Sequence, residues 1–212
     1  KNLEDENYEI IFREMKEVLE SITDRIENRF KNTFTPEIYF RLFIPNLYPQ
    51  YDKAIYLDSD IVVLGDISEL YNVEIGNNLI AAAPDDVIQT TKVFQEYAEK
   101  VVGVADYRNY FNAGILLMNL DEIRKFNFQD KFLYLLETIK FAVAQDQDYL
   151  NRLCKGKVKI IDKGWDRMPI ANDDLPIENI KIIHYNLADK PWKYDTIKYP
   201  KIVTYWIIRI SL

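Results

Sequence analysis

Residues 51–66 read YDKAIYLDSDIVVLGD and place an Asp-Ser-Asp sequence between two short apolar runs. The runs at 54–57 and 61–64 predict buried strands. Asp58 and Asp60 interrupt them, and burying carboxylates among such residues is costly unless the charges are paired. On extended backbone, side chains two residues apart point to the same side, so both carboxylates can bind one cation. Hard oxygen ligands suit Mg²⁺ or Mn²⁺. The alternative is a plain acidic turn, because Asp-x-Asp is a common sequence.

The composition predicts one globular domain of 212 residues, of which 48% are hydrophobic and 14% aromatic. A net charge of −7 argues against a general nucleic-acid-binding protein. No apolar run is long enough to span a bilayer, and no secretory signal pattern opens the sequence. Cys154 is the only cysteine, so no internal disulfide forms and a reducing, cytoplasmic location is expected. The six glycines form neither a G-x-G-x-x-G nor a Walker pattern, so the common routes to phosphate binding are unsupported.

The C-terminal part of the sequence is basic and aromatic. From Lys190 to the end there are five basic residues and one acid, Asp195, together with several Trp and Tyr residues. This combination favours peripheral contact with an anionic membrane surface, which for a cytoplasmic protein is the inner surface. A terminal helix packed on the body is the alternative interpretation.

The apolar patterns along the chain predict alternating strands and helices, and therefore an α/β fold. Most of the expected strands are continuously apolar, as in a sheet covered on both faces: 53–57, 60–64, 79–83, 115–118, 158–161 and 180–184. The expected helices are 3–30, 87–101, 128–141 and 146–154, with a short helix from Thr35-Pro36 through Arg41. We divide the chain into an N-terminal amphipathic helix region (1–34), a core (35–192) and a C-terminal segment (193–212).

Three further polar segments flank the predicted strands and helices. Residues 112–114 form an Asn-Ala-Gly turn before a strand, where backbone can approach a ligand closely. Residues 145–148 read Gln-Asp-Gln-Asp at a helix start, and capping by the helix dipole explains only part of this set. His184, the only histidine, ends a strand, and an imidazole with two carboxylates suits manganese. Lys190 precedes Pro-Trp and can hold a phosphate as a point charge. Taken singly, each segment also fits an ordinary turn, cap or surface side chain.

In this order, the segments resemble glycosyltransferase family 8, the retaining GT-A enzymes that include glycogenin and bacterial lipopolysaccharide galactosyl- and glucosyltransferases. The matching phrases run over most of the chain: YFRLFIPNLYPQYDKAIYLDSDIVVLGDISELY, YFNAGILLMNL, QDQDYLN and HYNLADKPW. The resemblance implies a GT-A-type, Rossmann-like α/β fold with a mostly parallel sheet flanked by helices. It also implies transfer of a hexose from UDP-glucose or UDP-galactose to a saccharide or glycolipid acceptor, with Mn²⁺ as cofactor and Mg²⁺ as second choice.

The resemblance also implies a role for each matching residue. Asp58, Asp60 and His184 would hold the metal against the donor diphosphate, and Lys190 would contact the phosphates. The remaining matches would bind or orient the donor sugar near the reacting carbon: Arg41, Asp85 (with Asp86 as a rival alignment), Asn112, Ala113, Gly114, Asp146 and Gln147. Gln147 is a poor nucleophile, which favours a front-face displacement over a covalent double displacement.

Two departures from the family pattern leave other functions open. Family members begin with a strand and an acid-x-Asn-Tyr turn that holds the nucleotide, and residues 5–8 match that turn by letter without a predicted strand before them. The chain is therefore interpreted as an N-terminally truncated relative, and the match as chance. Trp165-Asp166 stands where the family usually has Trp-Asn. A non-catalytic binding or scaffold relative is the main alternative, and a metal-dependent nucleotidyltransferase is a weaker one.

Overall fold

The structure is a computed structural model that describes residues 8–17, 36–171, 173–187, 190 and 192. Within this part of the chain the strands are β1 (Lys53–Leu57), β2 (Ile61–Val63), β3 (Ile80–Ala82), β4 (Ile115–Asn119), β5 (Val158–Ile160) and β6 (Ile182–His184). The α-helices are α2 (Ile44–Leu47), α3 (Ile67–Tyr71), α4 (Lys92–Tyr97), α5 (Leu120–Lys125), α6 (Phe128–Thr138) and α7 (Asp146–Leu153). Short 3₁₀ turns are η1 (Pro36–Phe43), η2 (Ile88–Thr90), η4 (Tyr107–Asn109), η5 (Lys163–Asp166) and η6 (Ile177–Asn179), and η3 (Ala98–Val102) is a π-helical turn.

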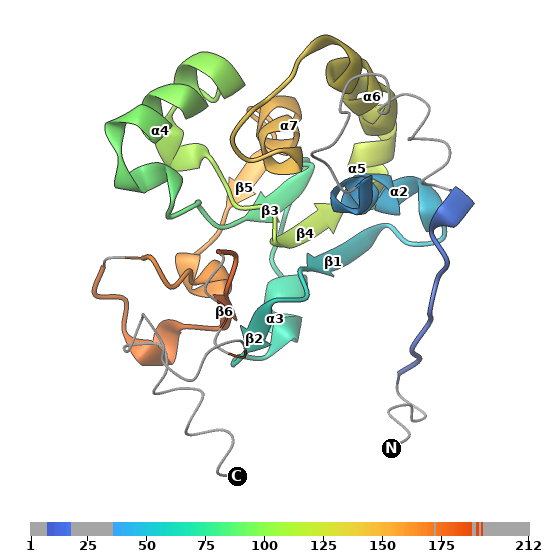
Figure 1. Ribbon diagram of the computed structural model, residues 1–212. Helices are drawn as coiled ribbons and strands as arrows, with labels where there is room; N and C mark the ends of the chain where they lie inside the picture. Colours follow the sequence, from blue (N-terminus) through green and yellow to red (C-terminus); the bar gives the residue numbers. More distant parts are fainter. Residues whose placement is uncertain (1–7, 18–35, 172, 188–189, 191, 193–212) are drawn as a thin grey trace.

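The main sheet has the strand order β1-β4-β3-β5 (Figure 1). β4 runs antiparallel to both β1 and β3, and β3 and β5 are parallel. The prediction of a mostly parallel sheet is therefore wrong for the described strands, which form a short mixed sheet. The apolar runs on which that prediction rested report burial on both faces, and an antiparallel strand buried on both faces has the same pattern.

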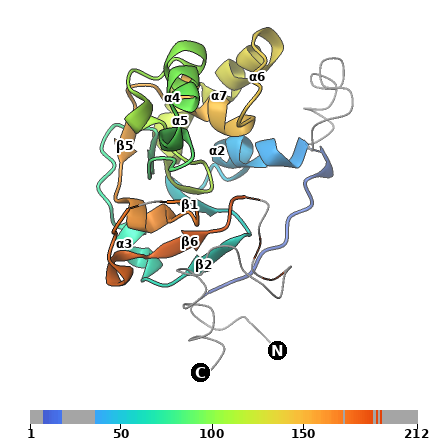
Figure 2. The ribbon, with the colours of Figure 1, turned by 60° about the vertical axis from the view of Figure 1, so that its left-hand side comes forward.

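The main sheet is covered on both faces by different layers. Helices α4, α6 and α7 lie on one side of it, and α3 with the β2–β6 pair lies on the other (Figures 1 and 2). Side chains of β4 alternate between these layers, as expected for a strand. Leu116 and Met118 belong to the large core under the helices, whereas Ile115 and Leu117 pack with Leu70 of α3 on the other face. This double coverage explains why β4 is continuously apolar.

A separate two-stranded ladder joins the start of the chain's core to its end. β2 and β6 are antiparallel, with Ile61 opposite His184 and Val63 opposite Ile182. The backbone N–H of Tyr185 donates to the carbonyl of Asp60 at 2.9 Å, which extends the ladder by one bond. The register therefore places His184 beside the Asp-Ser-Asp sequence that precedes β2.

The positions of the expected elements agree with the structure in most places. Every expected strand is present to within a residue or two. The expected helix 87–101 is divided into η2, α4 and η3, and the helices expected at 128–141 and 146–154 are α6 and α7. The short helix predicted after Thr35 is η1. Helices α3 and α5 were not predicted, because five or six residues are too few to show a helical period.

The expected helix over residues 3–30 is wrong for residues 8–15, which are not helical. Their apolar side chains remain largely exposed, and Phe12 is 94% exposed, so periodicity without a surface to bury against did not produce a helix here. Residues 1–7, 18–35 and 193–212 lie outside the described part of the chain, which includes most of both predicted terminal segments. Among the residues that are described, no helix is long and apolar enough to cross a membrane.

Candidate functional site

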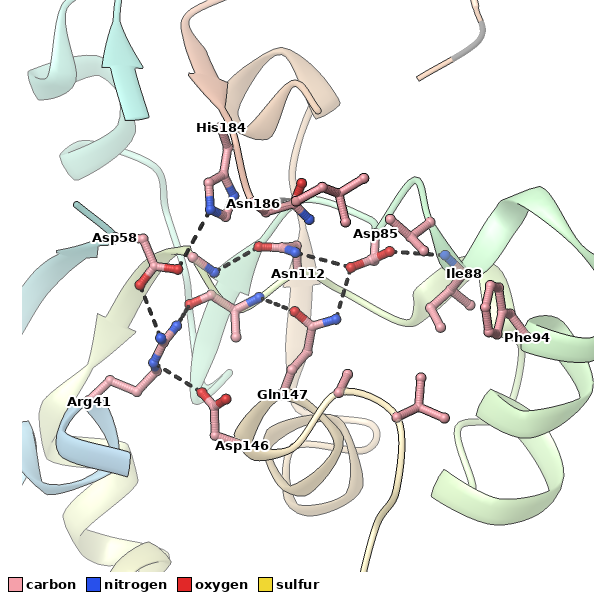
Figure 3. Close-up of a pocket in the computed structure, with 16 residues that line it drawn as sticks. Arg41, Asp58, Asp85, Ile88, Phe94, Asn112, Asp146, Gln147, His184 and Asn186 are labelled. Atoms are coloured by element: carbon pink, nitrogen blue, oxygen red, sulfur yellow. Dashed lines mark hydrogen bonds and ion pairs between the residues drawn. The ribbon is translucent and has the colours of Figure 1, made fainter. Parts of the chain in front are cut away.

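A pocket of about 330 Å³ lies at the end of β1, between the helical layer and the start of the β2–β6 ladder (Figure 3). Its lining combines charged, amide and apolar side chains: Arg41, Asp58, Asp85, Val87, Ile88, Phe94, Asn112, Ala113, Gly114, Val143, Ala144, Asp146, Gln147, His184, Asn186 and Leu187. In the close-up, the imidazole and Asp58 lie at one end of the pocket, and Ile88 and Phe94 lie at the other (Figure 3). The pocket thus has one polar end and one apolar end.

Asp58, Asp60 and His184 form a group whose ligand atoms all lie within 4.8 Å of one another. His184 Nε2 is 3.6 Å from Asp58 Oδ2 and 3.3 Å from Asp60 Oδ1. The other ring nitrogen, Nδ1, is 2.9 Å from Asp166 Oδ1. Two carboxylates and one imidazole in this arrangement are a suitable ligand set for a hard or borderline divalent cation.

The acidic neighbours strongly perturb the protonation of this group. Burial lowers the pKa of the His184 imidazole, but the nearby charges of Asp166 and Asp60 outweigh that effect and raise the pKa to about 9. Burial likewise opposes ionisation of Asp60, and the contacts with His184 and Lys190 hold its pKa well below the usual range. The cluster therefore favours positive charge at the imidazole, whether that charge is a proton or a metal ion.

Local backbone explains how these residues meet. Residues 58–60 form a bend between β1 and β2, not the extended segment that the sequence suggested, and β6 brings the imidazole to that bend. The N–H of Asp58 donates to the carbonyl of Gly114 at 2.8 Å. A Cβ at Gly114 would lie 2.1 Å from His184 Cε1, so the ring rests on the Cα of this glycine. The Asn-Ala-Gly turn thus leaves space for the imidazole.

Arg41 links two acidic residues of the pocket, Asp58 and Asp146. Its guanidinium lies 3.0 Å from Asp58 Oδ1 and 3.1 Å from Asp146 Oδ2, and it donates to the carbonyl of Ala113. The same group lies 4.4 Å from the centre of the Tyr56 ring, within the range of a cation–π contact. A planar guanidinium with several donors can hold these partners at once, so Arg41 fixes the orientation of both carboxylates.

Asp85, Asn112 and Gln147 form a hydrogen-bonded network along the pocket wall (Figure 3). Asp85 Oδ2 accepts bonds from Asn112 Nδ2 at 3.0 Å and from Gln147 Nε2 at 2.8 Å. Gln147 Oε1 accepts from the N–H of Ala113 at 2.9 Å, and Asn112 Oδ1 accepts from the N–H of Gly114 at 2.8 Å. The network orients both side-chain amides toward the same turn.

The rival residue Asp86 does not line the pocket. Burial raises its pKa to about 6, and the charges that act on it come from Arg167, Lys163 and Asp173 as well as Asp85. Of the two rival acids, only Asp85 lines the pocket, and Asp86 faces a different group of side chains.

The other predicted residues lie close to this pocket. Lys190 contacts a carboxylate oxygen of Asp60 and the carbonyl of Tyr185, so it lies beside the group of Asp58, Asp60 and His184 and not within the pocket lining. Within the sequence Gln-Asp-Gln-Asp, Asp146 and Gln147 line the pocket. Asp148 is fully buried elsewhere and accepts bonds from the hydroxyls of Tyr97 and Tyr110 at 2.8 and 2.6 Å. Every predicted site residue is thus in or beside one region.

Several residues at the site were given no site role by the sequence analysis. They are Val87, Ile88, Phe94, Val143, Ala144, Asn186 and Leu187 in the lining, and Asp166 behind His184. Val87, Ile88, Asn186 and Leu187 are near neighbours of predicted residues, which was an available signal. Phe94 and Val143 carried no signal, because a lone apolar residue in a helix or loop has no distinctive pattern. For Asp166 the signal was the departure from Trp-Asn.

Comparison with known proteins identifies the class of protein that this fold and site represent. The profile of the family described as "Glycosyl transferase family 8" matches residues 3–196. The chain belongs to this family. A putative glycosyltransferase of Haemophilus influenzae is 36% identical over 162 residues, covering 73% of this chain and 48% of the relative. Lipopolysaccharide 1,2-glucosyltransferase of Escherichia coli is 29% identical over 184 residues, covering 78% of this chain and 53% of the relative. The chain therefore spans about half the length of these two curated relatives.

A solved structure supports the GT-A-like α/β fold. The galactosyltransferase LgtC, crystallised in complex with donor and acceptor sugar analogues, aligns with a TM-score of 0.67 and 25% sequence identity. The alignment covers 89% of this chain and 72% of LgtC. The mixed sheet described above thus belongs to the same overall architecture.

Gly114→Ala is expected to weaken divalent-cation binding roughly 10- to 100-fold, the usual range when the groups that orient a metal ligand are disturbed. The added Cβ would overlap the imidazole of His184 and push it from the two carboxylates. Titration calorimetry with Mn²⁺ measures the effect. Gly156→Ala is the control, because its new Cβ meets no atom within 4 Å although its φ of 73° costs stability. Equal Mn²⁺ affinity in both variants and wild type would contradict the steric argument.

Asp146→Asn is expected to gain stability relative to wild type as the pH rises from about 4 to about 7. Burial raises the pKa of Asp146 from 3.8 to about 6, against the opposing effect of Arg41. Protonated Asp146 therefore stabilises the wild type fully below its pKa in the unfolded chain. This stabilisation is lost as the pH rises past the pKa of Asp146 in the folded protein, whereas the asparagine variant does not titrate. A shift of this size corresponds to up to about 3 kcal/mol. Urea unfolding at both pH values, with exposed Asp130→Asn as control, tests this; a pH-independent difference would refute it.

Proposed function

We propose that this chain is a retaining hexosyltransferase that moves glucose or galactose from a UDP-sugar to a saccharide or glycolipid acceptor. The proposal rests on the grouping of Asp58, Asp60 and His184 beside one end of a pocket whose wall carries amides and carboxylates suited to sugar hydroxyls. The names of the relatives support it, since one is a lipopolysaccharide glucosyltransferase and another is a galactosyltransferase bound to donor and acceptor sugar analogues. The identity of the hexose and the class of acceptor belong to this proposal, whereas membership of the glycosyltransferase family does not depend on it.

Asp58, Asp60 and His184 are the residues that would hold Mn²⁺, with Mg²⁺ as second choice. Their chemistry fits the ion, because His184 Nε2 is buried without a hydrogen-bond partner and lies close to both carboxylates. When bound, the ion would act as a Lewis acid on the diphosphate leaving group. Lys190, which reaches the same carboxylate cluster, would add a positive point charge for the phosphate oxygens.

The pocket wall offers polar groups for the donor sugar. Asp146 and Asn112 present oxygen and nitrogen atoms that suit sugar hydroxyls, and Arg41 and Asp85 hold these two side chains in place. Fixed orientation of the sugar is the contribution expected from such contacts, because it reduces the entropy lost on reaching the transition state. These residues therefore bind and orient the donor in the proposed reaction.

The proposed stereochemical course is a front-face displacement through a short-lived oxocarbenium ion. Both atoms of the Gln147 amide group are occupied, by the N–H of Ala113 and by Asp85. The nearby carboxylates are also engaged, since Asp146 pairs with Arg41 and Asp85 accepts bonds on both oxygens. Groups held in this way are poor nucleophiles. Mass spectrometry of enzyme mixed with donor is expected to detect no covalent glycosyl-enzyme, and a trapped adduct would establish double displacement instead.

Asp60→Ala is expected to remove metal-dependent turnover almost completely while the protein stays folded, because Asp60 is only half-buried and supplies one of three metal ligands. Release of UDP from UDP-glucose or UDP-galactose in the presence of Mn²⁺ measures turnover, and circular dichroism checks the fold. Undiminished turnover would refute the ligand assignment. Folded wild-type protein that gives no detectable heat with UDP and Mn²⁺ in calorimetry would favour the non-catalytic alternative. Release of pyrophosphate from the sugar nucleotide would favour a nucleotidyltransferase.

A further inference from the structure

Asp166 is held directly behind the imidazole of His184. It ends η5 and is 0% exposed. The N–H of Arg167 donates to the carbonyl of Ile182, and the N–H of His184 donates to the carbonyl of Arg167, each at 2.9 Å. These two bonds attach residue 167 to β6 and bring Asp166 Oδ1 to 2.9 Å from His184 Nδ1. The backbone therefore fixes the carboxylate and the ring in one relative position.

This contact determines which ring nitrogen of His184 faces the two carboxylates. An aspartate oxygen accepts hydrogen bonds, so the proton that it binds is on Nδ1, and Nε2 is left to face Asp58 and Asp60. Nε2 is buried and has no hydrogen-bond partner of its own. When the ring is neutral, this arrangement leaves the lone pair of Nε2 facing the place where a cation would sit.

The single contact with the His184 ring does not fully offset the negative charge of the buried Asp166 carboxylate. Its second oxygen, Oδ2, is buried and has no hydrogen-bond partner. A buried carboxylate with a single hydrogen bond is destabilising unless a positive charge lies nearby. A divalent cation on the far side of His184 would supply that charge through the ring.

We propose that Asp166 is a positioning residue for the metal site, forming a carboxylate–histidine–metal series with His184. The inference rests on the proposed metal-dependent function, and concerns a residue that the sequence analysis gave no role at the site. An asparagine there can still accept a bond from Nδ1–H, but it adds no charge. The carboxylate makes the imidazole a stronger ligand, so this chain binds a divalent cation more tightly than an asparagine-containing equivalent.

The test compares Mn²⁺ affinity in wild type, Asp166→Asn and Asp148→Asn, using titration calorimetry without nucleotide. The carboxylate also makes the imidazole bind protons more tightly, and protons compete with Mn²⁺ for it. Mn²⁺ affinity is therefore measured over a series of pH values, and the limiting affinities reached at high pH are compared. Asp166→Asn is expected to bind Mn²⁺ roughly 10- to 100-fold more weakly than wild type. Asp148→Asn is the matched control: Asp148 is also 0% exposed but bonds to Tyr97 and Tyr110, so this variant should lose stability and keep its Mn²⁺ affinity.

A second measurement uses the fact that the chain contains one histidine. In untagged protein labelled with ¹⁵N-histidine and saturated with Zn²⁺, every imidazole signal belongs to His184. Wild type is expected to show a metal-bound Nε2 and a slowly exchanging proton on Nδ1, and Asp166→Ala is expected to lose the slow exchange. This measurement on wild type needs no variant to fold.

The outcomes separate the two proposals. If wild type binds Mn²⁺ and Asp166→Asn has the same limiting affinity, or if the metal is bound through Nδ1, the role of Asp166 is overturned while the proposed function stands. If wild type binds no divalent cation, the metal site itself fails, and the inference about Asp166 fails with it.

Discussion

The site depends on one strand register, the antiparallel pairing of β2 with β6. In that ladder Ile61 lies opposite His184. This pairing places a histidine from late in the sequence beside the acidic bend that precedes β2. Because strand side chains alternate between faces, a slip of one residue would turn the imidazole to the opposite side. The bond from Tyr185 N–H to the carbonyl of Asp60 continues the ladder and opposes such a slip. Glycine at position 114 then provides the space that the ring requires.

The pocket concentrates negative charge, and the surrounding structure distributes positive charge around it. Arg41 spans Asp58 and Asp146, and Lys190 contacts Asp60. Partly buried charges interact more strongly than exposed ones, because less water screens them. Each cation therefore fixes the position of an acid as well as offsetting its charge. The polar end of the pocket is ordered by these contacts before any substrate is present.

Sequence reasoning predicted the positions of the strands and chose candidate site residues that lie in one region, but it failed on strand direction and on packing between distant segments. Apolar runs such as 115–118 report burial, which is why the strand was found and its antiparallel pairing was not. The order of the motifs along the chain indicated Asp85, Asn112 and Gln147, and these residues line the same pocket. The contact of Asp166 with His184 depends on β6 pairing, which no local pattern encodes. Residues 8–15 show the converse, a helical period without a helix.

A cation at the proposed site would also stabilise the layer that contains it. Asp58 and Asp60 belong to the bend after β1, whereas His184 belongs to β6, and β6 contributes Ile182 to the core on that face of the sheet. A ligand that binds only the folded arrangement adds its binding free energy to folding, about 2.7 kcal/mol at a concentration 100 times its Kd. In the proposed function the β2–β6 ladder brings the three ligands together, and a bound cation would in turn hold that ladder against the bend after β1.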